Sequence, residues 1–318
     1  MKKLFSIISL GLILWVLSCA AGATRSYAKE IALIWATKST VTSNTAIGFR
    51  AGMRQLAPDL KVTDYRERKN MEEAIQVFHE CESKVDGIVF LRSPGAEYLA
   101  KITPKIPCFI GGCNNPAEIG VIKNLSAPEG MVTGVTYFIP YDKRFSIIKS
   151  MFPGIKSVGL LAEKGHPSGV IEAAGTRKEC QRLGIAYKEA MVSNLDELVQ
   201  ETGNLAGNVD LLIVTNSNLL LDHMTNLLPI TNTTKTPWFS YADHPVKAGA
   251  VAGIAADDVK LGGMLAESVV DVLVRNKPIS QVPVKMDPEP KVTINEGMMR
   301  SLGLHFPEAI LKGATILR

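Results

Sequence analysis

The sequence predicts an α/β fold of two doubly wound parallel-sheet lobes, with a hinge and an interlobe ligand cleft. Two observations support this fold class. Short apolar runs alternate along the chain with longer amphipathic stretches, which is the pattern of strands that alternate with helices. The short runs are almost continuously apolar, as expected of parallel strands whose two faces are both covered by helices.

The elements fall into two series. The first has strands at IALIWAT, KVTDYR, DGIVFLR, IPCFIGG and MVTGVTY, with helices over 44–57 and 70–84. The second has strands at KSVGLLA, IAYKEA, DLLIVT, TPWFSY and AVAGIAA, with helices over about 168–183 and 194–204. Two series predict two lobes, and YFIPYDKR between them marks the hinge.

The last part of the chain is expected to contribute segments to both lobes. A long helix from about Asp258 to Arg275 is predicted to cross back and pack on the first lobe, and the proline-rich stretch NKPISQVPVKMDPEPK is a further crossing. The first lobe then consists of residues 29–137 and about 257–283. The second consists of residues 138–256 and about 284–318.

The first 28 residues have the pattern of an export signal peptide. Lys2 and Lys3 precede an apolar run that ends at Leu17, too short for a membrane span of about 20 residues. Cys19, in VLSCAAG, resembles the acylated cysteine of bacterial lipoproteins, and cleavage after Ala28 is the alternative. Both predict a periplasmic or extracytoplasmic protein, which would be lipid-anchored to the membrane if Cys19 is acylated.

The net charge and the spacing of potential metal ligands argue against a nucleic-acid-binding protein and against a metalloprotein. Removing the signal peptide takes away Lys2, Lys3 and Arg25 and no acidic residue, which lowers the formal net charge from +4 to +1. The remaining chain therefore lacks the basic character expected of a nucleic-acid-binding protein. No His, Cys or acidic cluster has metal-ligand spacing, so neither a metal nor a cofactor is predicted.

The cysteines do not predict an enzyme. A nucleophilic Cys113 would need a base within hydrogen-bond reach, and the five histidines are dispersed without a motif. Buried free thiols are the favoured interpretation of the four cysteines beyond the signal peptide, because cysteine is among the residues most often buried. A Cys108–Cys113 disulfide stays open in an oxidising compartment.

Polar residues that follow the strands are the candidate ligand contacts, because ligands of open parallel sheets bind beyond the carboxyl ends of the strands. In the first lobe they are Thr37, Ser39, Arg92, Ser93, Asn114, Asn115 and Tyr137, and in the second they are His166, Ser168, Asn216, Ser217, Asn218 and Asp243.

Several of these candidates have an alternative role. Asn115 and Ser168 also suit helix N-caps, and Arg92 either binds a carboxylate bidentately or lies on the surface. Tyr137 is suited to stack on a flat ligand.

Two longer motifs resemble a known family. They are NPAEIGVIKNLSAPEGMVTGVTY and INEGMMRSLGLHFPEAILKGATIL. Both are similar to the substrate-binding proteins of ABC transporters, in the branch with the type I periplasmic-binding-protein fold that includes tryptophan- and phenylalanine-binding members. The resemblance implies capture of a small-molecule ligand between the lobes and its delivery to an ABC permease in the inner membrane. The protein is expected to be a monomer.

The chain departs from the family pattern at the expected site. Asn114 and Asn115 stand where the family has Thr-Asp, and Ala242 stands where it has an aspartate. Asp243 is then the only rim carboxylate expected on the second lobe. We therefore expect a neutral or weakly anionic ligand with an aromatic or amide-like part, rather than an ordinary aromatic amino acid.

Two other function classes stay open. One is a ligand-binding sensory module for a membrane receptor. The other is an exported enzyme on the same scaffold, which is disfavoured because no acid, base and nucleophile converge at the strand ends.

Overall fold

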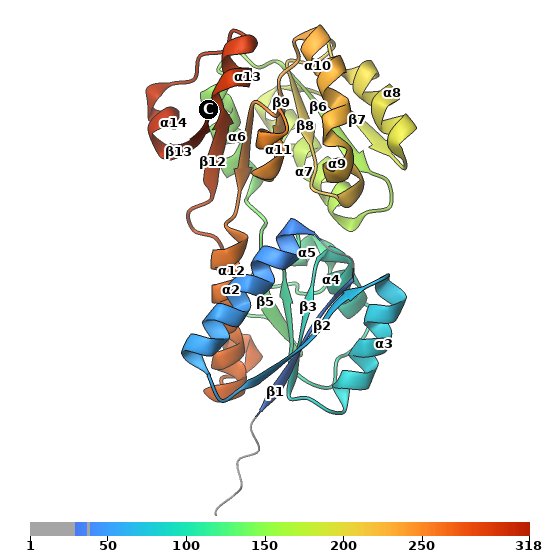
Figure 1. Cartoon of the computed structure of the whole chain (residues 1–318), viewed down its shortest axis with the longest axis vertical. Helices are drawn as coiled ribbons and strands as arrows, with labels where there is room; N and C mark the ends of the chain where they lie inside the picture. The colour runs from blue at the N-terminus through green and yellow to red at the C-terminus, as the bar shows by residue number, and fades with distance from the viewer. Residues whose placement is uncertain (1–28, 37–38) are drawn as a thin grey trace, which may run out of the picture.

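Two α/β lobes stand end to end in the computed structural model, which describes residues 29–36 and 39–318 (Figure 1). The sheet of the first lobe has the order β11-β5-β4-β3-β1-β2, and all its recorded pairings are parallel. Its strands are β1 (Glu30–Ala36), β2 (Lys61–Arg68), β3 (Gly87–Leu91), β4 (Cys108–Gly111), β5 (Val132–Thr136) and β11 (Lys285–Met286).

The sheet of the second lobe has the order β13-β12-β10-β9-β8-β6-β7. Its strands are β6 (Ser157–Glu163), β7 (Ala186–Val192), β8 (Leu211–Val214), β9 (Trp238–Ser240), β10 (Ala252–Ala255), β12 (Lys291–Asn295) and β13 (Ala314–Leu317). The first five are parallel, whereas β12 runs antiparallel to β10.

Helices cover both faces of each sheet. The first lobe has α2 (Thr40–Leu56), α3 (Met71–Glu82), α4 (Ser93–Ala100), α5 (Pro116–Ile119) and α12 (Asp258–Val269), which continues as a π-helical turn over Val270–Val274. The second has α6 (Tyr141–Met151), α7 (Pro167–Leu183), α8 (Leu195–Leu205), α9 (Asn218–His223), α10 (Leu228–Thr234), α11 (His244–Lys247), α13 (Glu296–Ser301) and α14 (Glu308–Gly313). Short 3-10 turns occupy Met224–Leu227 and Ile279–Gln281.

The continuous apolar runs are explained by the two cores of each lobe. Along β1, Ile31 and Leu33 pack into one core with α2 and α12, while Ala32 and Ile34 pack into another with α3. Successive side chains of a strand point to opposite faces. Every residue of such a strand is therefore buried, and the polar alternation of a half-exposed strand does not appear.

Local capping sets where the site-bearing helices begin. Helix α2 starts at Thr40, four residues before the predicted start, because Ser39 and Thr42 form a capping box. Asn70 caps α3 and Asp257 caps α12 through side-chain oxygens that accept backbone N–H groups.

The chain crosses between the lobes after β5, after β10 and again after β11. Strand β11, which the sequence-based division assigns to the second lobe, pairs with β5 of the first sheet. Strands β12 and β13 then complete the second sheet. The exact division of the chain into lobes stays a prediction.

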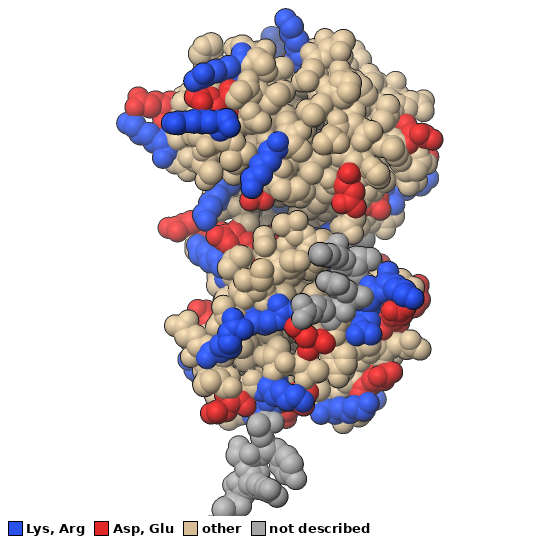
Figure 2. Space-filling view, in the orientation of Figure 1, with Lys and Arg blue, Asp and Glu red and all other residues tan. Residues whose placement is uncertain are grey.

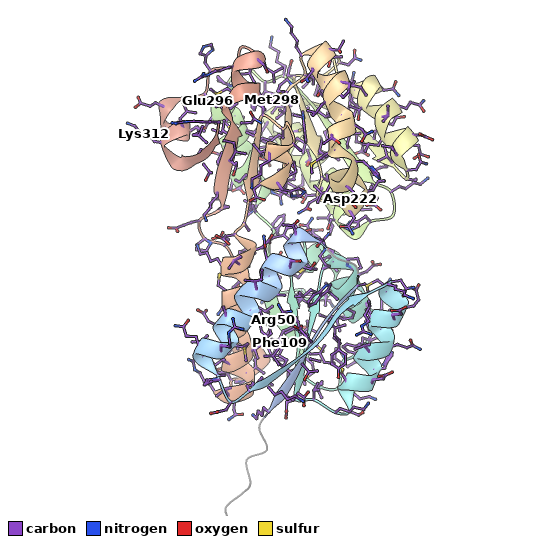
Figure 3. The ribbon with its side chains drawn as sticks, viewed as in Figure 1. Arg50, Phe109, Asp222, Glu296, Met298 and Lys312 are labelled. Carbon is purple, nitrogen blue, oxygen red and sulfur yellow. The ribbon has the colours of Figure 1, made fainter. Side chains whose placement is uncertain are left out.

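The outer surface carries both signs of charge. Figure 2 shows basic and acidic residues interspersed on the visible face of both lobes. Figure 3 shows Lys312 and Glu296 on the outer face of the second lobe, whereas Asp222 lies at the edge that faces the first. Among the helices of the described part of the chain, none is long and apolar enough to cross a membrane.

Helices α2 and α12 lie side by side although they are far apart in the sequence (Figure 1). A Cβ atom at Gly48 would lie 1.9 Å from the carbonyl oxygen of Val259, and one at Gly262 would lie 2.2 Å from that of Thr45. These contacts are between backbones, so the helices could accept a side chain there only by moving apart. Both positions require glycine.

We expect Gly262→Ala to destabilise the protein by about 1–3 kcal/mol, the range of an overpacked core substitution. Its matched control is Gly263→Ala in the same helix, where a Cβ atom would have no heavy atom of the described residues within 4 Å. That variant should gain about 0.5–1 kcal/mol, because alanine favours a helix more than glycine does. Urea unfolding of both variants measures the difference, and equal effects would contradict the close-packing explanation.

Candidate functional site

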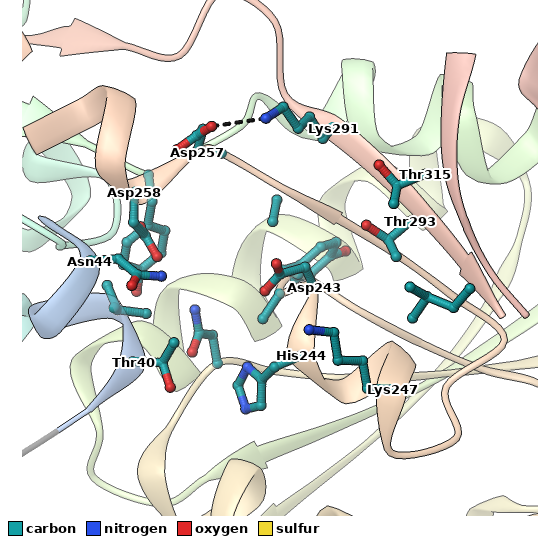
Figure 4. A pocket seen from close by; sticks show the side chains of 18 residues that line it. Thr40, Asn44, Asp243, His244, Lys247, Asp257, Asp258, Lys291, Thr293 and Thr315 are labelled. Atoms are coloured by element: carbon teal, nitrogen blue, oxygen red, sulfur yellow. Dashed lines mark hydrogen bonds and ion pairs between the residues drawn. The ribbon is translucent and has the colours of Figure 1, made fainter. Parts of the chain in front are cut away.

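The carboxyl ends of the two sheets meet at a cavity of about 340 Å³ (Figure 4). The first lobe lines it with Thr40, Val41 and Asn44 of α2, Tyr137 after β5, and Ala256, Asp257 and Asp258 around the start of α12. The second lobe contributes Asn216, Tyr241, Ala242, Asp243, His244, Lys247, Ala255, Lys291, Thr293, Thr315 and Leu317.

A second cavity, of about 320 Å³, adjoins the first. It shares Thr40, Val41 and His244 with the first cavity and is also lined by Ser39, Ser43, Arg92, Asn218, Leu221 and Asp222. We call the two cavities together the interlobe cleft. Six residues predicted from strand ends line it: Ser39, Arg92, Tyr137, Asn216, Asn218 and Asp243. Thr37 and Cys19 lie outside the described residues.

Polar atoms are buried beside the cleft without partners among the described residues. They include Nη1 of Arg92, the side-chain carbonyl oxygen of Asn216 and the hydroxyl of Ser217. Arg92 is 8% exposed, Asn216 7% and Ser217 1%. Buried polar groups nearly always have a hydrogen-bond partner, so these three are the best candidates for contact with a ligand.

Other predicted residues instead bond with one another across the lobes. The hydroxyl oxygens of Ser93 and Ser168 are 2.9 Å apart, and those of Tyr137 and Ser168 are 3.1 Å apart. Ser93 also accepts the backbone N–H of Asn114 at 3.1 Å. Ser93 and Tyr137 lie in the first lobe and Ser168 in the second, so the lobes touch directly here.

A buried ion pair extends the contact between the lobes. Asn114 of the first lobe donates its side-chain amide to Glu172 of α7 at 2.9 Å, and Glu172 accepts from Arg144 of α6 at 2.5 Å. The Arg144 guanidinium lies 4.0 Å from the centre of the Tyr241 ring. Charge pairing and cation–π contact compensate for removing Arg144 from water.

Three of the predicted residues act as helix caps. Asn115 accepts the backbone N–H of Ala117 and caps α5, and Ser39 caps α2. His166 caps α7 by accepting the N–H of Ser168 at 3.2 Å. Burial, together with a smaller effect of the nearby Arg92, lowers the pKa of His166 to about 4. His166 is therefore neutral at physiological pH and able to accept this bond.

Asp258 was missed by the strand-end argument because it lies at the start of a helix. It lines the cleft opposite Asp243 (Figure 4), and no hydrogen bond or ion pair of its carboxylate is recorded among the described residues. Burial raises its pKa to about 7; Arg92 lowers it, and Asp243 and Asp257 raise it. Asp258 therefore adds a first-lobe carboxylate to Asp243, the rim carboxylate expected on the second lobe.

Cys113 is buried behind the cleft. Its thiol donates to the carbonyl of Val135 at 3.7 Å, and burial raises its pKa to about 12. Since the thiolate is the reactive form, this cysteine is a poor nucleophile. Cys81, Cys108 and Cys180 are buried free thiols as well.

The raised pKa of Asp258 gives a testable pH dependence. Its pKa in the folded state, about 7, lies above the unfolded value of about 4. The folded protein therefore holds this proton more tightly, and the contribution to stability falls as pH rises through this window. We expect Asp258→Asn to stabilise the ligand-free protein by up to about 4 kcal/mol at pH 8, the free-energy equivalent of the difference between these two pKa values, and by almost nothing at pH 4.

Urea unfolding of variant and wild type at each pH measures this difference. His166 also makes stability depend on pH: its pKa is lowered in the folded protein, so its contribution to stability rises between about pH 4 and 6.5. Comparing the variant with the wild type at the same pH cancels this contribution, because both proteins contain His166. Asp59→Asn, at an exposed position of the same lobe, should have little effect at either pH. A gain that is equal at pH 4 and pH 8 would show that Asp258 is not the titrating group.

The chain matches one family model and is similar to a known protein. A family model described as ABC transporter substrate binding protein matches residues 41–317. A relative described as a tyrosine-binding protein, from Clostridioides difficile (strain R20291), is 26% identical over 221 residues. The match covers 70% of this chain and 64% of the relative, so the chain spans less than two thirds of that relative's length.

Two solved structures are similar to this fold. One is a domain from Streptococcus pneumoniae in complex with L-Trp, with a TM-score of 0.80 and 20% identity over 92% of this chain and 100% of that one. The other is the ligand-free, open structure of a substrate-binding protein with adhesive properties from Clostridium difficile. It has a TM-score of 0.74 and 22% identity over 91% of this chain and 99% of that one.

Proposed function

This chain belongs to the family of ABC transporter substrate-binding proteins, and from that premise we propose that it captures a small molecule between its lobes and delivers it to a membrane permease. One observation carries the proposal for this chain. Buried polar groups of both lobes, Arg92 on one side and Asn216 on the other, line the interlobe cleft and have polar atoms without protein partners among the described residues. A ligand that bonds to both would hold the lobes together.

We further propose that the protein does not transform its ligand. A nucleophile needs an activating base and an accessible position. The buried Cys113 has a raised pKa, which keeps its thiol protonated at neutral pH. The hydroxyls of Ser93 and Ser168 bond to each other. We also propose that the protein is a monomer.

The ligand expectation changes because of Asp258. Aromatic amino acids were not expected as ligands because few carboxylates could bind their ammonium group. Asp258 supplies a further carboxylate within the cleft. The relatives named above include a tyrosine-binding protein and a domain in complex with L-Trp. We therefore propose a ligand that has a cationic or hydrogen-bond-donating group beside Asp258, and amino acids are again within this class.

The proposed function is tested by identifying the ligand and following closure. The compound that co-purifies with the protein is released by unfolding and identified by mass, and the refolded protein is titrated with it by calorimetry. We expect saturable binding at one site and a smaller radius of gyration by small-angle scattering when the ligand is added. Saturation without any change in the scattering profile would contradict closure of the lobes.

We propose that the protein is exported and anchored through a lipid on Cys19. The support is the residue pattern VLSCAAG, which directly follows an apolar run. The native protein should partition into the detergent phase, and Cys19→Ser should prevent processing and acylation at that position. An unlipidated product that starts at Lys29 would contradict the anchor but not export.

A further inference from the structure

We propose that Arg92 and the N-terminus of helix α2 form an anion-binding subsite of the cleft, so that the ligand carries a carboxylate or phosphate group. This inference rests on the proposed function and specifies the chemistry of the captured molecule. It depends on three features: the unpaired guanidinium, the position of the helix and the backbone conformation of Arg92.

The Arg92 guanidinium is buried without an ion-pair partner within 4.0 Å among the residues described. The side chain is 8% exposed, no hydrogen bond or ion pair of the guanidinium is recorded, and Nη1 is buried without a partner. The other buried arginine, Arg144, pairs with Glu172 at 2.5 Å and lies over aromatic rings. Since an unpaired buried charge is costly, Arg92 lacks the acidic partner that Arg144 has.

The N-terminus of α2 faces the same cavity. Ser39, Thr40 and Val41 line it together with Arg92. Helix α2 is 17 residues long and has no acidic residue in its first turn. Ser39 already accepts the N–H of Thr42, which leaves the N–H groups of Thr40 and Val41 without a recorded partner among the described residues, and the helix dipole favours an anion there. Two independent sources of positive potential therefore act on one cavity.

The nearby acidic residues do not form an ion pair with Arg92, although Asp258 is close enough for Arg92 to lower its pKa. Asp222 lines the same cavity and Asp258 the adjoining one, yet no ion pair within 4.0 Å joins either to Arg92. Their separation leaves Arg92 available to a ligand.

Arg92 also has a backbone conformation that is normally reserved for glycine. Its φ is 76° and its ψ is 160°, a region that costs other residues energy and whose outliers cluster at ligand sites. A glycine would relieve this strain. An arginine at this position is explained if its side chain is needed in the cleft.

Small anions test the subsite directly. Thermal unfolding of the full-length protein is followed during titration with acetate, with inorganic phosphate and with matched amounts of sodium chloride. We expect a saturable rise in melting temperature with acetate or phosphate, and the stronger response identifies carboxylate or phosphate as the preferred group. Arg92→Gln should weaken the response at least tenfold, whereas Arg54→Gln, at an exposed position of the same lobe, should respond as the wild type does.

A wild type that does not respond to either anion, or an Arg92→Gln variant that responds equally, would overturn the subsite. Arg92→Gly separates binding from folding, because it should lose the anion response while its melting temperature without anion stays at or above that of the wild type. A lower melting temperature together with an unchanged response would mean that Arg92 has only a structural role.

A second experiment separates this inference from the proposed function. Paired compounds that differ only in a carboxylate or its neutral amide are titrated by calorimetry, beginning with L-tyrosine and L-tyrosinamide and with L-tryptophan and L-tryptophanamide. If the acid binds at least tenfold more tightly and Arg92→Gln removes the preference, the subsite is supported. Equal binding of acid and amide would overturn the subsite and leave capture of a solute intact. Failure of every organic compound would count against the proposed function, and the small-anion titration would still decide the subsite.

Discussion

The close contact between helices α2 and α12 determines the geometry of the first lobe and of the cleft. Gly48 and Gly262 let the two backbones meet where any side chain would force them apart. Both helices begin at the cleft, so this contact also fixes the separation of Thr40 and Asn44 from Asp258. A packing requirement inside one lobe thus sets the spacing of polar groups that lie outside its core.

The two sides of the lobe interface differ in chemistry. On the α7 side, Ser93 bonds to Ser168 and Asn114 bonds to Glu172, so the polar groups of one lobe satisfy those of the other. On the α2 side, cavities separate the lobes, and Arg92 and Asn216 have unpaired atoms. The protein alone completes one half of the interface. A ligand therefore has to supply hydrogen-bond partners only to the polar groups on the α2 side, which limits the number of bonds that the ligand must form.

The sequence predicts the fold well because the fold depends on patterns that repeat along the chain. Continuous apolar strands and amphipathic helices are visible without knowledge of any contact, and the predicted return of α12 to the first lobe agrees with its packing against α2. The site is predicted less completely. Strand-end reasoning finds Arg92, Asn216 and Ser217 because parallel strands bring their carboxyl ends together.

The same reasoning misses Arg144 and Glu172, whose pairing joins two helices and leaves no spacing motif. It misses Asp258 because this residue lies at the start of helix α12 and does not directly follow a strand. It also cannot distinguish a ligand contact from a cap, and Asn115 and Ser39 prove to cap helices.

The return of the chain to its first lobe has a consequence for biosynthesis. The core around β1, which begins at Glu30, is shared with α12, which begins at Asp258. Contacts between such distant parts of a chain slow folding because a long loop must close first. Domains usually fold in order as they emerge during synthesis, but this lobe must wait until nearly the whole polypeptide has been made. The nascent first lobe therefore exposes apolar strands for most of translation, a period in which a chaperone has the opportunity to bind.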